Sequence, residues 1–95
     1  MLERDYQKKL KQKLEKIFPG CIVLKNDAQL KQGIPDLLVL FKDKWAGLEV
    51  KKSESASHRP NQDYNVGRMN EMSYAAFIYP ENEEKIFSEL EEVFR

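Results

Sequence analysis

The sequence predicts an α/β (α+β) domain in the order α-β-β-β-α-β-α, with one mixed sheet flanked by helices. Apolar residues recur every three or four positions near both ends of the chain, as in amphipathic helices. Four short apolar runs lie between them, bounded by Pro, Gly, Ser or charged residues, as is typical of strands. With 95 residues and 41% hydrophobic residues, the chain can build one small core, so we expect residues 1–95 to be a single domain.

The first predicted helix has one apolar stripe and ends at Pro19-Gly20. The stripe comprises Leu2, Tyr6, Leu10, Leu14, Ile17 and Phe18. A strand-like run follows over 21–24, and then a polar connection. Residues 37–41 contain no polar side chain, as in a strand buried on both faces. The turn at Lys42-Asp43-Lys44 predicts a return strand over 45–51.

The second half begins with a polar, Ser-rich segment over 52–59, which we expect to be a mobile loop. Pro60 suits the first turn of a helix that runs to about Met72. A strand is expected over 74–79, stopped by Pro80, and a final amphipathic helix from Asn82 on an acidic background.

Composition excludes several classes of protein. No apolar run approaches the ~20 residues of a membrane span, and no leader precedes a cleavage site, so we expect a cytoplasmic protein with no membrane partner. The single Cys21 excludes an internal disulfide and a multi-cysteine zinc site. Because no glycine-rich phosphate loop is present, we expect no nucleotide cofactor.

The formal net charge of zero hides an asymmetry along the chain. Residues 1–60 hold 13 Lys and Arg against 8 Asp and Glu, whereas residues 61–95 hold 3 against 8. The basic part is able to face a polyanion, although a charge run is more often only a solvated surface.

Hairpin geometry brings Asp36, Glu49 and Lys51 together. A two-residue turn at Lys42-Asp43 pairs the strands so that, continued inward, Asp36 lies opposite Glu49. Opposed residues point to the same face with Cβ atoms ~5 Å apart, and Lys51 shares that face. An odd loop length would shift the register by one and leave a diagonal pair.

Two close carboxylates repel unless a cation lies between them. Mg²⁺ prefers oxygen ligands, so Asp36, Glu49 and the backbone carbonyl of Val50 are predicted to hold it. Lys51 would then orient a water molecule or stabilise the transition state. The alternative is a solvated Asp–Lys–Glu cluster at a strand end.

Gly33-Ile34-Pro35-Asp36, an apolar strand and then Leu48-Glu49-Val50-Lys51 resemble the signature of the PD-(D/E)XK nuclease superfamily. The form particularly resembles stand-alone VRR-Nuc domains of phage and mobile-element type, which include Holliday-junction resolvase-like nucleases. The chain lacks the Val-Arg-Arg element of that family's name. The resemblance implies a restriction-endonuclease-like αβββαβα core.

The resemblance also implies an activity. We expect an Mg²⁺-dependent endodeoxyribonuclease, with Mn²⁺ able to substitute, that selects branched or distorted DNA such as a Holliday junction and leaves 5′-phosphate ends. Cleavage of both strands of a junction would need a two-fold symmetric homodimer. A gene carried by a phage or mobile element in a bacterial host fits the same resemblance.

Further site residues follow from the family. An acidic residue of the first helix that reaches the metal is expected at Glu3, with Glu15 as the alternative. Gln62 is expected beside the motif lysine, as a catalytic group that positions it or the water. Candidate contacts to nucleic-acid phosphates are Lys31, Lys52, His58 and Arg59.

Two other functions stay open from the sequence. A non-catalytic nucleic-acid-binding or regulatory module would keep the nuclease fold without the reaction, although the intact Asp36, Glu49 and Lys51 favour catalysis. An RNA-directed nuclease would differ only in substrate.

Overall fold

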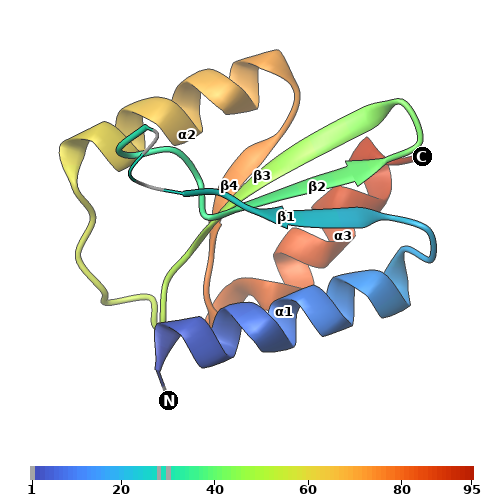
Figure 1. Ribbon diagram of the computed structural model, residues 1–95, viewed down its shortest axis with the longest axis horizontal. Coiled ribbons are helices and arrows are strands. Elements are labelled where there is room, and N and C mark those ends of the chain that lie inside the picture. Colours follow the sequence, from blue (N-terminus) through green and yellow to red (C-terminus); the bar gives the residue numbers. More distant parts are fainter. Residues whose placement is uncertain (1, 28, 30) are drawn as a thin grey trace.

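Three α-helices and a four-stranded sheet follow one another in the predicted order in the computed structural model, which describes every residue except 1, 28 and 30 (Figure 1). The elements are α1 (Glu3–Ile17), β1 (Ile22–Lys25), β2 (Leu37–Phe41), β3 (Lys44–Val50), α2 (Pro60–Met72), β4 (Ala75–Ile78), a 3₁₀ turn η1 (Pro80–Asn82) and α3 (Glu83–Val93). The predicted α+β class is confirmed. Within the part of the chain that is described, no helix has the length and apolar character needed to cross a membrane.

The sheet has the order β1-β2-β3-β4 and is mixed. Strands β1, β2 and β3 are antiparallel neighbours, whereas β4 runs parallel to β3 after the crossover through α2. The turn between β2 and β3 has two residues, with Lys42 in a left-handed conformation (φ 58°). This turn sets the predicted register, which pairs Phe41 with Lys44 and Leu37 with Leu48.

The helices cover the two faces of the sheet unequally. Helix α2 packs over β3 and β4 on one face, and α1 and α3 cover the other (Figure 1). The main core lies under α1 and α3, where Leu10, Leu14 and Leu90 are fully buried. Three aromatic rings, those of Phe18, Phe41 and Phe94, close one end of this core with centroids 5.2–5.8 Å apart.

Element boundaries differ from the prediction by one or two residues. The last helix begins at Glu83 rather than at Asn82, because Pro80 starts a separate 3₁₀ turn. The Asn82 side chain closes that turn, with its Oδ1 accepting the Tyr79 N–H at 2.9 Å. Strand β4 is also shorter than the predicted 74–79.

Candidate active site

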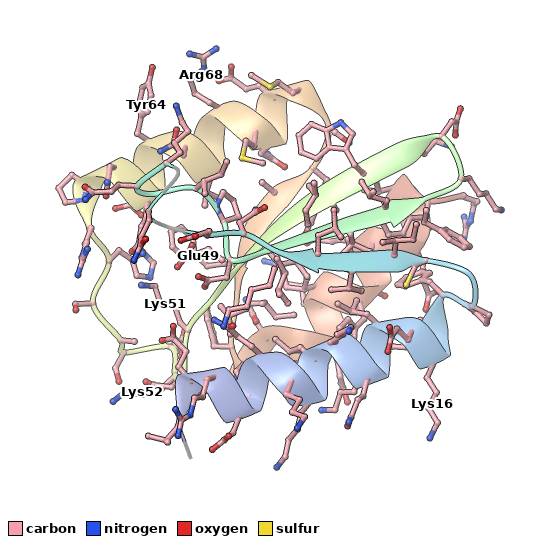
Figure 2. The ribbon with its side chains drawn as sticks, in the orientation of Figure 1. Lys16, Glu49, Lys51, Lys52, Tyr64 and Arg68 are labelled. Carbon is pink, nitrogen blue, oxygen red and sulfur yellow. The ribbon has the colours of Figure 1, made fainter. Side chains whose placement is uncertain are left out.

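The end of β3 and the N-terminal ends of α1 and α2 lie on the same side of the molecule (Figure 1). Residues from these ends line a hollow of about 450 Å³. Figure 2 shows Glu49, Lys51 and Lys52 gathered at this end of the molecule. We call it the site hollow; its walls are Glu3, Asp36, Glu49, Lys51, Lys52, Ala56, Ser57, Arg59 and Gln62. The fold therefore brings the three residues of the predicted motif together.

Asp36 lies in a bend just before β2, and hydrogen bonds from Asn26 hold the backbone there. The Asn26 N–H donates to the Asp36 carbonyl at 2.8 Å, and the Asn26 side-chain amide donates to the Pro35 carbonyl at 2.6 Å. One carboxylate oxygen of Asp36 accepts the Val50 N–H at 2.9 Å. The carboxylate is thereby held against the last residue of β3.

This contact corrects one detail of the prediction. Asp36 was expected to continue the ladder directly opposite Glu49, but the ladder ends with Leu37 and Leu48. Pro35 has no N–H to extend the strand pairing, and the chain bends there. The Asp36 side chain, rather than its backbone, takes up the Val50 amide, and its charge still acts on Glu49.

Glu49 is buried, with 2% of its surface exposed. Its Oε2 accepts a hydrogen bond from the Gln62 amide at 3.1 Å, while its Oε1 has no hydrogen-bond partner among the described residues. The pKa of Glu49 is raised to about 8, mainly by burial. The charge of Asp36, a hydrogen bond with Asp36 and the charge of Glu3 raise this pKa further, whereas the charge of Lys51 lowers it.

These features fit a divalent cation bound by oxygen. A buried carboxylate oxygen without a partner is costly, and so are two neighbouring negative charges. A hard cation would relieve both costs at once. Asp36 and Glu49, two of the predicted ligands, both line the site hollow. Val50 meets Asp36 through its N–H, and the role of its carbonyl as a third ligand stays a prediction.

Lys51 is nearly as buried as Glu49, and its ammonium group is held in place. Its Nζ donates to Gln62 Oε1 at 2.9 Å and lies 3.9 Å from Glu49 Oε2. Gln62 Oε1 also accepts the Arg59 N–H at 3.1 Å, at the start of α2. Gln62 thus lies beside the motif lysine, as predicted, and links it to Glu49.

Glu3 lines the site hollow from the first turn of α1. Across the described residues, no three Asp, Glu, His or Cys side chains are close enough together to hold one ion. Glu3 therefore does not complete a three-carboxylate cluster with Asp36 and Glu49, and its role toward a metal stays a prediction. Glu15, the alternative, is near the other end of α1 in a separate hollow and is removed from the site.

The four predicted phosphate contacts have different surroundings. Lys52 and Arg59 line the site hollow. Lys31 lines another depression, together with Tyr64 and Arg68 of α2. Figure 2 shows these two α2 side chains away from Glu49 and Lys51.

His58 has a packing role that the sequence does not reveal. Its ring stacks on Phe77 with centroids 3.9 Å apart, and its Nδ1 pairs with Asp63 at 3.0 Å. Both ring face and ring nitrogen are therefore engaged within the fold.

Gln7 is a further polar residue near the site that was not among the predicted site residues. It is buried on the inner face of α1, one turn after Glu3, and its Oε1 has no partner among the described residues. The available signal was its place between Tyr6 and the next core position, Leu10, where an apolar residue is the usual choice.

Comparison with known proteins supports the fold. No protein-family model matches the sequence, and no curated protein matches it either. A solved structure described as "VRR_NUC domain" is similar over 98% of this chain and 97% of that one, with a TM-score of 0.70 and 28% sequence identity. The predicted resemblance to VRR-Nuc domains of the PD-(D/E)XK superfamily is confirmed. The roles of individual side chains stay predictions.

Proposed function

We propose that this chain, which shares its fold with a VRR_NUC domain, is a metal-dependent nuclease that hydrolyses phosphodiester bonds in DNA. The observation that supports it most is the Glu49 carboxyl group, which is buried beside Asp36 and has one oxygen without a hydrogen-bond partner among the described residues. A stability role alone would not favour such an arrangement, because the buried charge and the orphaned oxygen both destabilise the fold.

Asp36, Glu49 and the Val50 carbonyl would hold the cation, with Glu3 acting through water. Bound there, Mg²⁺ or Mn²⁺ would offset the charge that develops on the scissile phosphate and lower the pKa of water. Two carboxylates and a backbone oxygen are ligands typical of Mg²⁺, which keeps several waters.

Lys51 would act on the phosphate, and Gln62 would position Lys51. Water adds to phosphorus, the bond from phosphorus to the 3′ oxygen breaks, and a proton passes to that oxygen, which leaves a 5′-phosphate and a 3′-hydroxyl. The Lys51 ammonium faces the negative charge that grows on the phosphoryl oxygens. Gln62 keeps the ammonium in place through its 2.9 Å hydrogen bond.

The shape of the site favours a strand that passes through it. A second hollow of about 230 Å³ shares four residues with the site hollow, so the carboxylates lie where the two meet. The shared residues are Asp36, Glu49, Arg59 and Gln62. Internal cleavage suits this layout better than trimming from an end. We propose branched or distorted DNA as the preferred substrate, recognised through its backbone and shape.

Cutting a four-way junction on both strands would need two sites, so we propose a two-fold homodimer. The edge strand β1 presents two exposed apolar side chains, Ile22 and Leu24, which support such pairing. Sedimentation of wild type beside Ile22→Lys/Leu24→Lys tests this. We expect a dimer that the variant converts to a monomer; a monomeric wild type on and off DNA would contradict it.

The reaction is tested by incubating plasmid, linear duplex, a four-way junction and single-stranded RNA with protein in Mg²⁺, in Mn²⁺ or in chelator. We expect cleavage only with metal, strongest on the junction. Asp36→Asn, Glu49→Gln and Lys51→Ala should each abolish it, whereas Lys16→Gln, at the far end of α1, should cleave as wild type (Figure 2). Asn at position 36 can still accept the Val50 N–H, which protects the fold.

Three outcomes would contradict part of this proposal. Junction binding with no cleavage in either metal would indicate a non-catalytic module with a nuclease fold. Cleavage that survives in Asp36→Asn would come from a contaminant. Preferential cutting of RNA in direct competition would redirect the substrate assignment.

A further inference from the structure

Beside the site hollow, another concavity lies between the first turns of α1 and strands β1 and β2. Its volume is about 280 Å³. We call it the basic pocket; its walls are Arg4, Gln7, Lys8, Lys11, Val23, Lys25 and Leu37. Four of these side chains are cationic and none is acidic, so the pocket has a strong preference for anions.

The cations of the basic pocket are free to meet a ligand. Among the residues that the structure describes, Arg4, Lys8, Lys11 and Lys25 form no ion pair, in contrast to Lys13, which binds Glu83 at 2.7 Å. The apolar Val23 and Leu37 form the remaining wall.

Gln7 is an independent sign of a ligand. The residue is only 9% exposed, yet it lines the basic pocket with an Oε1 that has no partner in the described part of the chain. Leaving a buried polar atom unsatisfied costs about 1–3 kcal/mol. A leucine here would pack without that cost, so an amide at this position is better explained by a group that it binds.

The amide is suited to a phosphate and its sugar. The Gln7 amide has both kinds of hydrogen-bonding group: its NH₂ group can donate to phosphate oxygens, and its carbonyl can accept from a hydroxyl. At ~30 Å³ per water, the pocket has room for roughly nine waters, which accommodates a phosphate with part of a sugar.

The basic pocket adjoins the catalytic centre through shared elements. Glu3 lines the site hollow and the next residue, Arg4, lines the basic pocket. In the same way Asp36 belongs to the site hollow and Leu37 to the pocket. A strand whose scissile phosphate lies at Asp36 would therefore have a neighbouring phosphate within reach of α1.

We infer that the basic pocket binds a backbone phosphate of the substrate strand next to the cleaved bond, with Arg4, Lys8 and Lys25 neutralising its charge and Gln7 contacting it directly. This inference rests on the proposed nuclease function and extends it. It places the strand across the first two turns of α1.

Equilibrium binding of a fluorescent four-way junction in chelator, where no cleavage interferes, tests the inference over a range of salt concentrations. Arg4→Gln/Lys25→Gln should bind about tenfold more weakly, and its log K against log salt slope should be less steep by about 0.9, one phosphate's worth. The matched control is Lys9→Gln/Lys16→Gln, which removes the same charge from the outer hollow of α1. It should keep wild-type slope and affinity within about twofold.

Gln7→Leu separates binding from folding. We expect this variant to melt at the same temperature as wild type or higher, because the orphaned polar atom is gone, and yet to bind the junction several-fold more weakly. A lower melting temperature together with weaker binding would show that Gln7 is structural and would overturn its role.

The remaining outcomes distinguish this inference from the proposed function. If wild type cleaves DNA but the pocket variants bind like the control, the pocket inference is wrong and the nuclease stands. If no protein cleaves but binding still depends on the pocket, the nuclease proposal fails and the contact stands. Titration with inorganic phosphate or a nucleoside monophosphate tests whether the pocket binds a free phosphate compound instead of DNA. If such a compound binds in the pocket and the pocket variants leave DNA affinity unchanged, the pocket is assigned to the free compound.

Discussion

Gln62 is the side chain that connects the parts of the candidate site. Its amide oxygen accepts hydrogen bonds from Lys51 and from the Arg59 N–H, and its amide nitrogen donates to Glu49. The polarity of the amide suits this position, since the oxygen faces a cation and the NH₂ group faces an anion. Neither a carboxylate nor an alkyl side chain can satisfy both neighbours.

We therefore predict that Gln62→Leu lowers the cleavage rate about 10–100-fold, the usual effect of removing a group that orients a ligand or a catalytic side chain. Because Gln62 acts on Lys51 and Glu49 rather than on the DNA backbone, kcat should fall while the affinity measured in chelator stays near wild type. Steady-state kinetics at saturating Mg²⁺ and anisotropy give the two quantities.

The matched control is Asn65→Ala, one turn along α2, where the side-chain amide donates to the Asn61 carbonyl. It should retain full activity. Equal rates for Gln62→Leu and Asn65→Ala would remove Gln62 from the mechanism.

At the scale of elements, the β2–β3 hairpin shows which features the sequence predicts and which it does not. The two-residue turn at Lys42-Asp43 and the unbroken apolar strand were enough to predict the register and the meeting of Asp36 with Glu49. The backbone at Asp36 was not predictable, because its bend depends on Asn26, which lies beyond a long loop in sequence.

Tertiary contacts determine the positions of some side chains that the sequence pattern does not predict. The stacking of His58 on Phe77 joins two segments that only the α2 crossover brings together. The position of Glu3 in the wall of the site hollow depends on how α1 lies across the sheet. Periodicity places these residues on an element, but not at a distance from one another.

The loop that leads to Asp36 depends on close approach to α2 at Gly33. This glycine has a left-handed backbone (φ 80°), and a Cβ built there would lie 2.8 Å from the Asn61 side chain and 2.9 Å from its backbone. Gly20 has a similar φ of 94°, but a Cβ there meets nothing within 4 Å. The two glycines share a left-handed backbone, which would strain a residue with a Cβ, and differ in the space around them.

We predict that Gly20→Ala costs about 1–2 kcal/mol, the strain of a left-handed residue with a Cβ. Gly33→Ala should cost more, and only this variant should also lower cleavage, because the segment that carries Asp36 must shift. Urea unfolding and a junction assay measure both effects. Equal destabilisation and equal activity in the two variants would mean that the contact with Asn61 is unimportant.

Helices α1 and α3 are joined on the core side by a polar contact. The Tyr6 hydroxyl donates to Glu83 at 2.6 Å, and Lys13 binds the other oxygen of the same carboxylate at 2.7 Å. Burial, and then the hydrogen bond and charge of Glu83, raise the pKa of Tyr6 well above its usual range. A tyrosine that stays neutral in the fold contributes stability below its unfolded pKa, ~10, and loses that contribution as pH rises above it.

Tyr6→Phe is predicted to lower stability by about 1.5–3 kcal/mol at neutral pH, the usual contribution of a hydrogen bond to a charged group. Between about pH 9.5 and 11 it should also lose less stability than wild type, since one group no longer ionises on unfolding. Denaturation across this range tests both, with the exposed Tyr64→Phe as control. Parallel pH curves for Tyr6→Phe and wild type would contradict the prediction.

Over the whole molecule, charge is divided between the two parts of the chain. Arg4, Lys8 and Lys11 of α1 line the basic pocket, and Lys52 and Arg59 after β3 line the site hollow. Helix α3, by contrast, is rich in acidic residues. DNA is expected to approach the end where β3 stops and to be repelled from α3. A domain of this size has a small free energy of unfolding, so the cost of burying Glu49 is a large fraction of it.

Metal binding should therefore register in global stability. A ligand that binds only the folded state at 100 times its Kd stabilises it by about 2.7 kcal/mol. For a domain of this size, that shift corresponds to roughly 10–20 °C in Tm. We predict such a rise for wild type in Mg²⁺ over chelator. Glu49→Gln should lack it, yet its metal-free form should be at least as stable as wild type, because Gln avoids the cost of ionising a buried carboxyl group beside Asp36.

Glu84→Gln on α3 is the control, since it removes one exposed carboxylate from the acidic helix and none from the site. It should keep the full rise in Tm. If Glu49→Gln gained as much stability from Mg²⁺ as wild type, the ion would be binding at the acidic surface, and the buried carboxylate pair would need another partner. A loss confined to Glu49→Gln would instead tie the stability of the whole domain to the same oxygen atoms that are proposed to perform the chemistry.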